Sequence, residues 1–410
     1  MPDFIQGVGR ELPFILLLIA LLGFRWRVTP KASVLIRAPI ETVFALVDFR
    51  EGDTQRWQRT KVNCQIVDAG TQTFRLKFTT TLTTGAMQTS EADFRVAERD
   101  EPRLVEIDRA GLEGQSTNNQ LMKMRAELTP EGKATRLKLT YHWGPRPLLA
   151  QLLARTDLWG SIYRLKGVAE TGRPDYWTDR LLSTGVAIGT GIVTLATFAF
   201  GFGWVVAFLL VGALLVHEFG HLLAYRLIGQ PWGRLIFLPF LGAVAVPRLG
   251  FSTQAQSVFA ALMGPALSVA LPLSVVIYVW AGGQRTDVPV LTGIVASALN
   301  LFNLVPVEPL DGGVVVRSVL ARLLGNWARF GMIVIGSLII LVGWQAELVL
   351  LVIFGAIAIV ANIRPRTIDP GLAPLSSLQV AIAAFSFMSV VAAYAVLLRF
   401  LLGQAALMAG

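Results

Sequence analysis

The stretch GWVVAFLLVGALLVHEFGHLLAYRLIG, residues 203–229, places two histidines and a glutamate inside one of the most apolar runs of the chain. An ionisable side chain at the centre of a bilayer costs at least ~2.5 kcal/mol. Three of them within HEFGH, residues 217–221, need a compensating interaction, and coordination of a metal ion provides one. On a helix, His217 and His221 project from one face about one turn apart, so both imidazoles can reach the same ion.

Two physical regimes divide the chain of 410 residues. Apolar residues make up 54% of it and charged residues 15%, against about 25% charged in a typical soluble domain. Residues 28 to about 180 still have an ordinary soluble composition, whereas long apolar runs dominate from residue 183 onward. We therefore expect a soluble domain followed by membrane helices. The expected spans are 183–203, 204–228, 255–281, 288–307, 330–344, 347–362 and 376–402.

The net charge of +9 is explained by topology, so we expect no nucleic-acid partner. Arginines cluster in alternate short loops between the apolar spans, which is the positive-inside pattern. These arginines are Arg226, Arg234, Arg248, Arg317, Arg322, Arg329, Arg364 and Arg366. We expect an integral protein of a bacterial cytoplasmic membrane, with the Arg-rich loops and the soluble domain in the cytoplasm. The single cysteine, Cys64, excludes a disulfide framework and a Cys-based metal site.

The soluble part is expected at 28–171, between a membrane anchor at 1–27 and a juxtamembrane linker at 172–182. The apolar run at 12–24 is short, and we interpret it as an uncleaved anchor. After it come a strand, a helix that begins near Pro39, six segments with the period-2 pattern of antiparallel strands, and a long amphipathic helix. His142, within these strands, has no metal-ligand spacing and is interpreted as an ordinary surface or edge residue.

This order of elements, with the segment VLIRAPIETVFALVDF at 34–49 and Trp57, resembles the SRPBCC or START-like helix-grip fold. The resemblance implies a sheet wrapped around a long helix and a hydrophobic cavity that could take a lipid-like ligand. The alternative is a core filled by side chains, in a domain that only holds partners.

A third metal ligand is expected from NLFNLVPVEPLDGG, residues 300–313, at the end of another apolar span. Pro306 and Pro309 interrupt the helix, so the backbone can turn and direct the Asp311 carboxylate inward. A catalytic zinc site uses three protein ligands and keeps one position open for water. Glu218, beside His217, can accept the proton of that water.

The pairing of membrane-embedded HExxH with N-x-x-P-x-x-P-L-D-G-G resembles the site-2 protease family of intramembrane zinc metalloproteases, over about 183–325. The resemblance implies one Zn²⁺ per chain, held by His217, His221 and Asp311, with Glu218 as general base. The segment LMGPALS resembles the family's Gly-Pro segment, and 234–250 resembles a membrane-dipping hairpin that can pair with substrate as an added strand. Candidate substrate-binding residues are Gly264, Pro265, Gly242 and Glu308.

Some positions depart from the family or have two interpretations. Glu308 replaces an apolar residue or proline, and is either a solvated residue at the cytoplasmic mouth or a contributor to water access. Ser268 stands where Asn is common, which puts a substrate contact there in doubt. Asn303 could donate a hydrogen bond to the peptide carbonyl or the developing oxyanion, or hold helices together. The family's usual PDZ module is not visible.

The fold class we expect is a polytopic α-helical membrane protein with a site-2-protease-like core at 183–325, further helices at 326–410 and an N-terminal α+β helix-grip domain. The expected activity is cleavage of single-span membrane proteins, with the soluble domain recruiting substrate or sensing a hydrophobic ligand. Two alternatives remain open. One is an inactive zinc-binding scaffold or sensor, and the other is a lipid-binding or transport protein centred on the helix-grip domain.

Overall fold

The computed structural model describes residues 26–111, 121–146, 148–239, 242–283, 287–363 and 372–409. Its contacts separate the described residues into one unit up to Val186 and a second unit from Ala187 onward. The apolar run at 12–24, expected to be an anchor, lies outside the described residues. Trp26 and Arg27, expected to end that anchor, instead belong to a short strand of the first unit.

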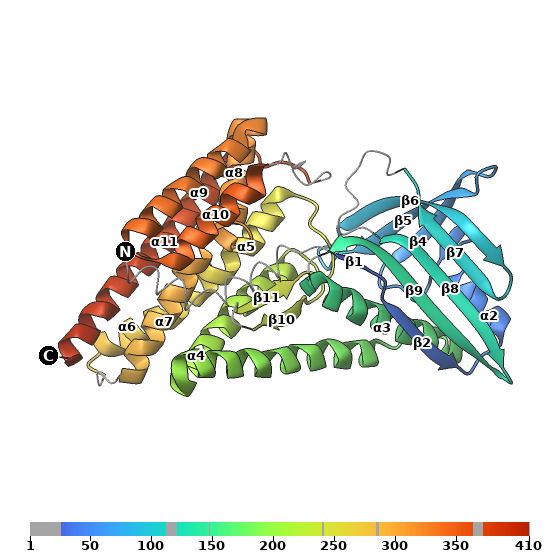
Figure 1. Ribbon diagram of the computed structural model, residues 1–410, viewed down its shortest axis with the longest axis horizontal. Helices are drawn as coiled ribbons and strands as arrows, with labels where there is room; N and C mark the ends of the chain where they lie inside the picture. Colours follow the sequence, from blue (N-terminus) through green and yellow to red (C-terminus); the bar gives the residue numbers. More distant parts are fainter. Residues whose placement is uncertain are drawn as a thin grey trace. The chain divides into compact units, whose positions relative to one another are not determined.

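An antiparallel sheet of nine described strands dominates the first unit, and its strands appear in Figure 1 as blue to green arrows. The hydrogen-bonded order is β1-β9-β8-β7-β6-β5-β4-β3, and β2 also pairs with β9. The strands are β1 (Trp26–Val28), β2 (Lys31–Ile36), β3 (Gly52–Thr54), β4 (Lys61–Asp68), β5 (Thr73–Thr81), β6 (Met87–Asp100), β7 (Leu104–Arg109), β8 (Leu121–Glu131) and β9 (Ala134–Arg146). Two helices accompany them, α2 (Ile40–Val47) and α3 (Leu148–Thr171).

One face of this sheet packs on α2 and α3 and forms the core of the unit. Period-2 alternation directs residues such as Phe94 and Leu139 inward, where they meet Leu158 and Ile162 of α3. Trp57 is also buried there and donates its indole N–H to the carbonyl of Leu46, 2.8 Å away. The buried side chains of the described residues therefore form one apolar cluster between the sheet and the two helices.

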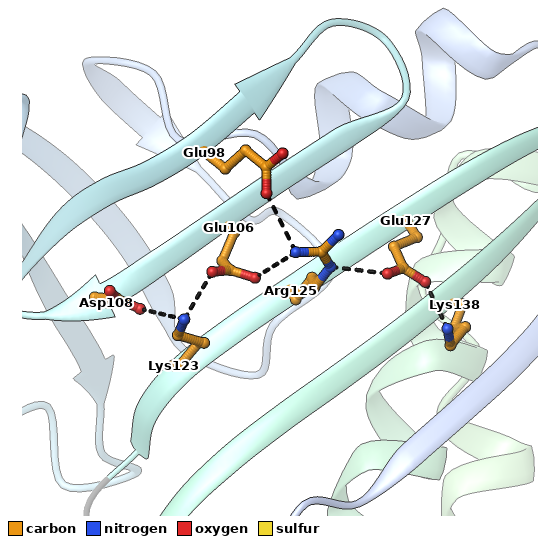
Figure 2. A network of polar contacts seen from close by, with 7 residues as sticks. All are labelled: Glu98, Glu106, Asp108, Lys123, Arg125, Glu127 and Lys138. Carbon is orange, nitrogen blue, oxygen red and sulfur yellow. Dashed lines mark hydrogen bonds and ion pairs between the residues drawn. The ribbon is translucent and has the colours of Figure 1, made fainter.

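The opposite face carries a ladder of alternating charges across four strands, shown in Figure 2. Glu106 of β7 accepts hydrogen bonds from Lys123 and Arg125 of β8 at 2.7 and 2.8 Å. Arg125 also reaches Glu98 of β6, and Lys138 of β9 donates to Glu127. Burial of Glu106 opposes ionisation, but the hydrogen bonds from the two cations prevail and lower its pKa. The ladder ties β6, β7, β8 and β9 together by their side chains.

The second unit is built of apolar helices and a two-stranded hairpin. Four helical segments, 176–227, 254–280, 311–345 and 377–408, are long and apolar enough to cross a membrane. The helices are α4 (Tyr176–Leu227), α5 (Gln254–Ser268), α6 (Ala270–Trp280), α7 (Asp287–Asn303), α8 (Asp311–Leu324), the 3₁₀ turn η2 (Gly325–Trp327), α9 (Ala328–Gln345), α10 (Val349–Ile363) and α11 (Ser377–Ala409). The hairpin strands are β10 (Arg234–Leu238) and β11 (Gly242–Val246). The expected combination of a sheet domain with a polytopic helical part is confirmed.

Helix α4 begins in the first unit and is interrupted at Gly203, where φ is 79° and ψ is 161°. This break falls where the sequence pattern divides the spans 183–203 and 204–228. The segment expected to be a linker at 172–182 already contains the first turns of α4. There Asp179 is buried and pairs with Arg164 at 2.9 Å and with Arg59.

Candidate metal centre

His217 and His221 lie on the last turns of α4, with their Nε2 atoms 3.0 Å apart. Both side chains are buried, as the apolar surroundings of HEFGH predict. The Nδ1 atom of His217 is 2.7 Å from Oδ1 of Asn300, and the Nδ1 atom of His221 is 2.7 Å from the carbonyl oxygen of Ala260. Because both partners are acceptors, each Nδ1 carries the proton and each Nε2 presents a lone pair. This is the tautomer that a metal-binding imidazole requires.

Asp311, the first residue of α8, supplies the third donor atom. Its Oδ2 lies 3.1 Å from Nε2 of His217 and 3.4 Å from Nε2 of His221. Ligands about 2.0 to 2.1 Å from a tetrahedral zinc ion lie roughly 3.3 Å from one another. The three mutual separations of 3.0, 3.1 and 3.4 Å therefore fit an ion of that size.

The turn that presents Asp311 requires glycine at the two following positions. A Cβ on Gly312 would overlap the Leu304 carbonyl, and a Cβ on Gly313 would overlap the backbone nitrogen of Glu308. Glu308 itself pairs through both carboxylate oxygens with Nη1 of Arg317, at 2.7 and 2.8 Å. Arg317 lies on α8, so this ion pair fastens the turn to the helix that Asp311 begins.

Glu218 is buried beside the two histidines. One of its carboxylate oxygens lies within 4.8 Å of a ring nitrogen of each histidine. Its carboxylate accepts a hydrogen bond from the backbone N–H of Ala245 in β11. The Oε2 atom is buried without a hydrogen-bond partner among the residues that the structure describes. A buried carboxylate oxygen without a partner costs free energy unless a further group, such as a water molecule, meets it there.

Two glycines let α4 and α5 approach at the centre. A Cβ on Gly220 would overlap the Met263 carbonyl, and a Cβ on Gly264 would overlap the imidazole of His221. The carbonyl of the next residue, Pro265, accepts a hydrogen bond of 2.7 Å from the buried hydroxyl of Tyr394 in α11. Gly264 and Pro265 thus support the histidines through packing and backbone contacts.

Asn300, which sequence reasoning missed, bonds His217, whereas Asn303 is the final residue of α7 and makes none of the contacts to the histidines described above. Asn300 donates its own amide N–H to the carbonyl of Ala296, and this bond fixes which end of the amide faces His217. The Asn300 side chain is fully buried, and a polar amide within an apolar span is costly. The presence of such a residue in the span was therefore the sequence signal that pointed to a role for Asn300. Gly242 lies at the start of β11 with φ of 112°, and a Cβ there would stand 3.2 Å from the side chain of Leu214.

No protein-family model matches the chain. Over 131 residues the chain is 33% identical to a protein of Synechocystis sp. that is provisionally named as a zinc metalloprotease, and the match covers 30% of this chain and 33% of that protein. Over 132 residues it is also 33% identical to Rip3 of Mycobacterium tuberculosis, provisionally named in the same way, with the same coverage. The match thus spans about a third of the length of these curated relatives. The names of these relatives agree with the zinc metalloprotease that the two motifs indicate.

The chain also has matches among solved structures, at low identity and low TM-score. The site-2 protease of Methanocaldococcus jannaschii is 19% identical, with a TM-score of 0.29, and the match covers 43% of this chain and 89% of that one. The Aha1 dimer of Colwellia psychrerythraea is 17% identical, with a TM-score of 0.27, and the match covers 35% of this chain and 98% of that one.

Proposed function

We propose that the chain is an intramembrane zinc metalloprotease that hydrolyses peptide bonds of membrane-spanning proteins. The observation that carries the proposal is the convergence of two imidazole Nε2 atoms and one carboxylate oxygen within 3.4 Å of one another, among apolar helices. His217, His221 and Asp311 would hold one Zn²⁺. The curated relatives named as zinc metalloproteases support the same activity.

Each residue of the centre has a distinct task in this proposal. Zinc, when bound, lowers the pKa of water toward about 7 and polarises a carbonyl group. Oε2 of Glu218 accepts the proton of the attacking water, and the bond from the Ala245 N–H holds the carboxylate in place meanwhile. Glu218 then returns the proton to the departing amine of the cleaved peptide. Asn300 and Ala260 keep the histidines in the tautomer that binds metal.

The proposed substrates are single-span membrane proteins. An intact helix uses its own carbonyls for hydrogen bonding, so the cleaved segment must first unwind. The hairpin of β10 and β11 offers a strand edge to which an extended segment could add, near Gly242. The soluble unit would recruit substrate or sense a hydrophobic ligand, on the cytoplasmic side of a bacterial cytoplasmic membrane.

The test compares purified wild-type protein with Glu218→Gln and with the matched control Glu347→Gln, which alters an exposed glutamate in the turn between α9 and α10. Metal analysis and cleavage of a candidate single-span substrate are measured together. We expect one zinc per chain in all three proteins and a loss of about 10² to 10⁴ in cleavage rate for Glu218→Gln alone. Loss of zinc from Glu218→Gln would contradict the role given to this residue.

The two alternatives make different demands. An inactive zinc scaffold needs no buried carboxylate oxygen free to accept a proton, and Glu218 has one. A lipid-binding or transport protein needs space inside the sheet unit, where the buried cluster includes large side chains such as Trp57 and Phe44. Mass spectrometry of ligands extracted from the purified protein tests the lipid-binding alternative, which predicts a stoichiometric lipid.

A further inference from the structure

We infer that Tyr225 is a positioning residue for Glu218 and acts through Ala245 of β11; this inference rests on the proposed function. The backbone N–H of Ala245 donates to the Glu218 carboxylate. The carbonyl oxygen of the same residue accepts a hydrogen bond of 3.0 Å from the Tyr225 hydroxyl. Glu218 and Tyr225 lie on α4 seven residues apart, which is about two helical turns and therefore the same face.

The pairing of the hairpin shows why Ala245 depends on α4. In an antiparallel pair, both backbone polar groups of a residue point either toward the partner strand or away from it, in alternation. Ala245 stands opposite Leu235 of β10, and its N–H and C=O are directed to α4. Phe237, two residues after Leu235, donates its N–H away from the hairpin to Thr190, which agrees with this alternation. The polar groups of Ala245 are therefore outside the β10–β11 ladder, and α4 satisfies them.

Packing fixes the Tyr225 ring, so its hydroxyl has little freedom to move. The ring is 95% buried, in a cluster that includes Ala245 and Ala260. A Cβ on Gly233 would stand 2.8 Å from the ring and 2.7 Å from the carbonyl oxygen of Val246. Tyr225 thus contacts both β11, which holds Glu218, and α5, whose Ala260 carbonyl holds His221.

Removing the Tyr225 hydroxyl would leave the Ala245 carbonyl buried without its donor and would loosen β11 at that residue. The Glu218 carboxylate would lose its fixed orientation as a consequence. The histidines would keep their own partners, Asn300 and Ala260, so metal binding would persist. A variant without the Tyr225 hydroxyl should therefore lose turnover and keep its zinc.

The experiment compares full-length wild type with Tyr225→Phe and with the matched control Tyr278→Phe, which removes a hydroxyl from a partly exposed tyrosine of α6. We expect kcat of Tyr225→Phe to fall about tenfold, at the lower end of the effects seen when an outer-shell partner is removed. KM and zinc content should stay at the wild-type values, and Tyr278→Phe should match wild type throughout. A rise in KM with unchanged kcat would overturn the inference, because Tyr225 would then serve substrate binding. Loss of zinc would overturn it too.

Hydrogen exchange tests the same connection without depending on activity. In Glu218→Ala, the amide of Ala245 loses its acceptor and should exchange faster, whereas the amide of Val244, which pairs within the ladder opposite Ile236, should not change. Unchanged exchange at Ala245 would overturn the inference even if Tyr225→Phe fails to fold. Absence of zinc and cleavage in wild type would instead contradict the proposed function, and the exchange result would still report on the connection.

Discussion

Gly264 of α5 lies against the imidazole of His221 so closely that a single added carbon would overlap the ring. The contact brings the backbone of α5 beside the Nε2 edge of His221, and a carbonyl one turn earlier, that of Ala260, holds the opposite edge of the ring. Helix α5 therefore fixes His221 both by its shape and by a hydrogen bond.

Gly264→Ala should displace His221 and weaken zinc binding. Because the added carbon overlaps a ligand side chain in a packed interior, relaxation moves the imidazole away from its partners. We expect at least a tenfold loss of zinc affinity, measured by competition with a chelator. Gly212→Ala is the control, because Gly212 lies on the same helix as His221 and its Cβ would meet open space. An effect of equal size at both glycines would contradict the explanation.

Asn300→Ala should reduce zinc affinity about 10- to 100-fold, because His217 loses the acceptor that fixes its tautomer. Asn303→Ala removes the same side chain one turn later and should have a smaller effect. Isothermal titration with zinc on the metal-free proteins measures both. A larger loss of zinc affinity in Asn303→Ala than in Asn300→Ala would contradict the hydrogen bond given between Asn300 and His217.

The ion pair between Glu308 and Arg317 should support Asp311 through the turn before α8. Glu308→Gln and Arg317→Gln should each weaken zinc binding several-fold, and the double variant should lose little more than either single variant. A double-mutant cycle in zinc affinity measures the coupling, for which about 1 kcal/mol is expected for a partly exposed pair. Strictly additive losses would mean that the two residues act separately.

The charge ladder should make the stability of the sheet unit depend on pH. Burial opposes ionisation of Glu106, but hydrogen bonds from Lys123 and Arg125 lower its pKa below the unfolded value, near 4.3. The ladder therefore contributes stability above that unfolded pKa, and the contribution is lost as pH falls through the lower folded pKa. Thermal unfolding followed by the β-sheet circular dichroism signal should show this loss on acidification.

Glu106→Gln should flatten that acid dependence, because the variant has no proton to gain at this position. Glu41→Gln, which alters an exposed glutamate on the first turn of α2, is the control and should keep the wild-type profile. If the two variants respond to pH alike, the dependence arises outside the ladder.

The sequence predicts which residues meet at the centre, His217, His221 and Asp311, because their chemistry is encoded locally. HEFGH places two imidazoles on one helical face, and the prolines and glycines around Asp311 specify a turn. Asn300 and Tyr225 were missed because their roles arise from partners far along the chain, 83 residues away in one case and 20 in the other. In the sequence, both are ordinary residues of apolar spans. Only the packing of the elements brings their hydrogen-bond partners to them.

The sheet unit shows the same limit. Period-2 alternation predicts the long strands but not β1 and β3, because three residues are too few to display a period. The start of α4 was interpreted as a linker because its aromatic and basic residues suit a membrane interface. Asp179 is buried there only because Arg59 and Arg164, distant in sequence, converge on it.

That burial decides where the sheet unit can be cut from the rest of the chain. A fragment ending at Thr171, the last residue of α3, would lack Asp179 and so break its buried ion pair with Arg164, and breaking a buried pair by removing one partner typically costs about 3 to 5 kcal/mol. A fragment extended through Val186 would include Asp179 and keep its ion pair with Arg164.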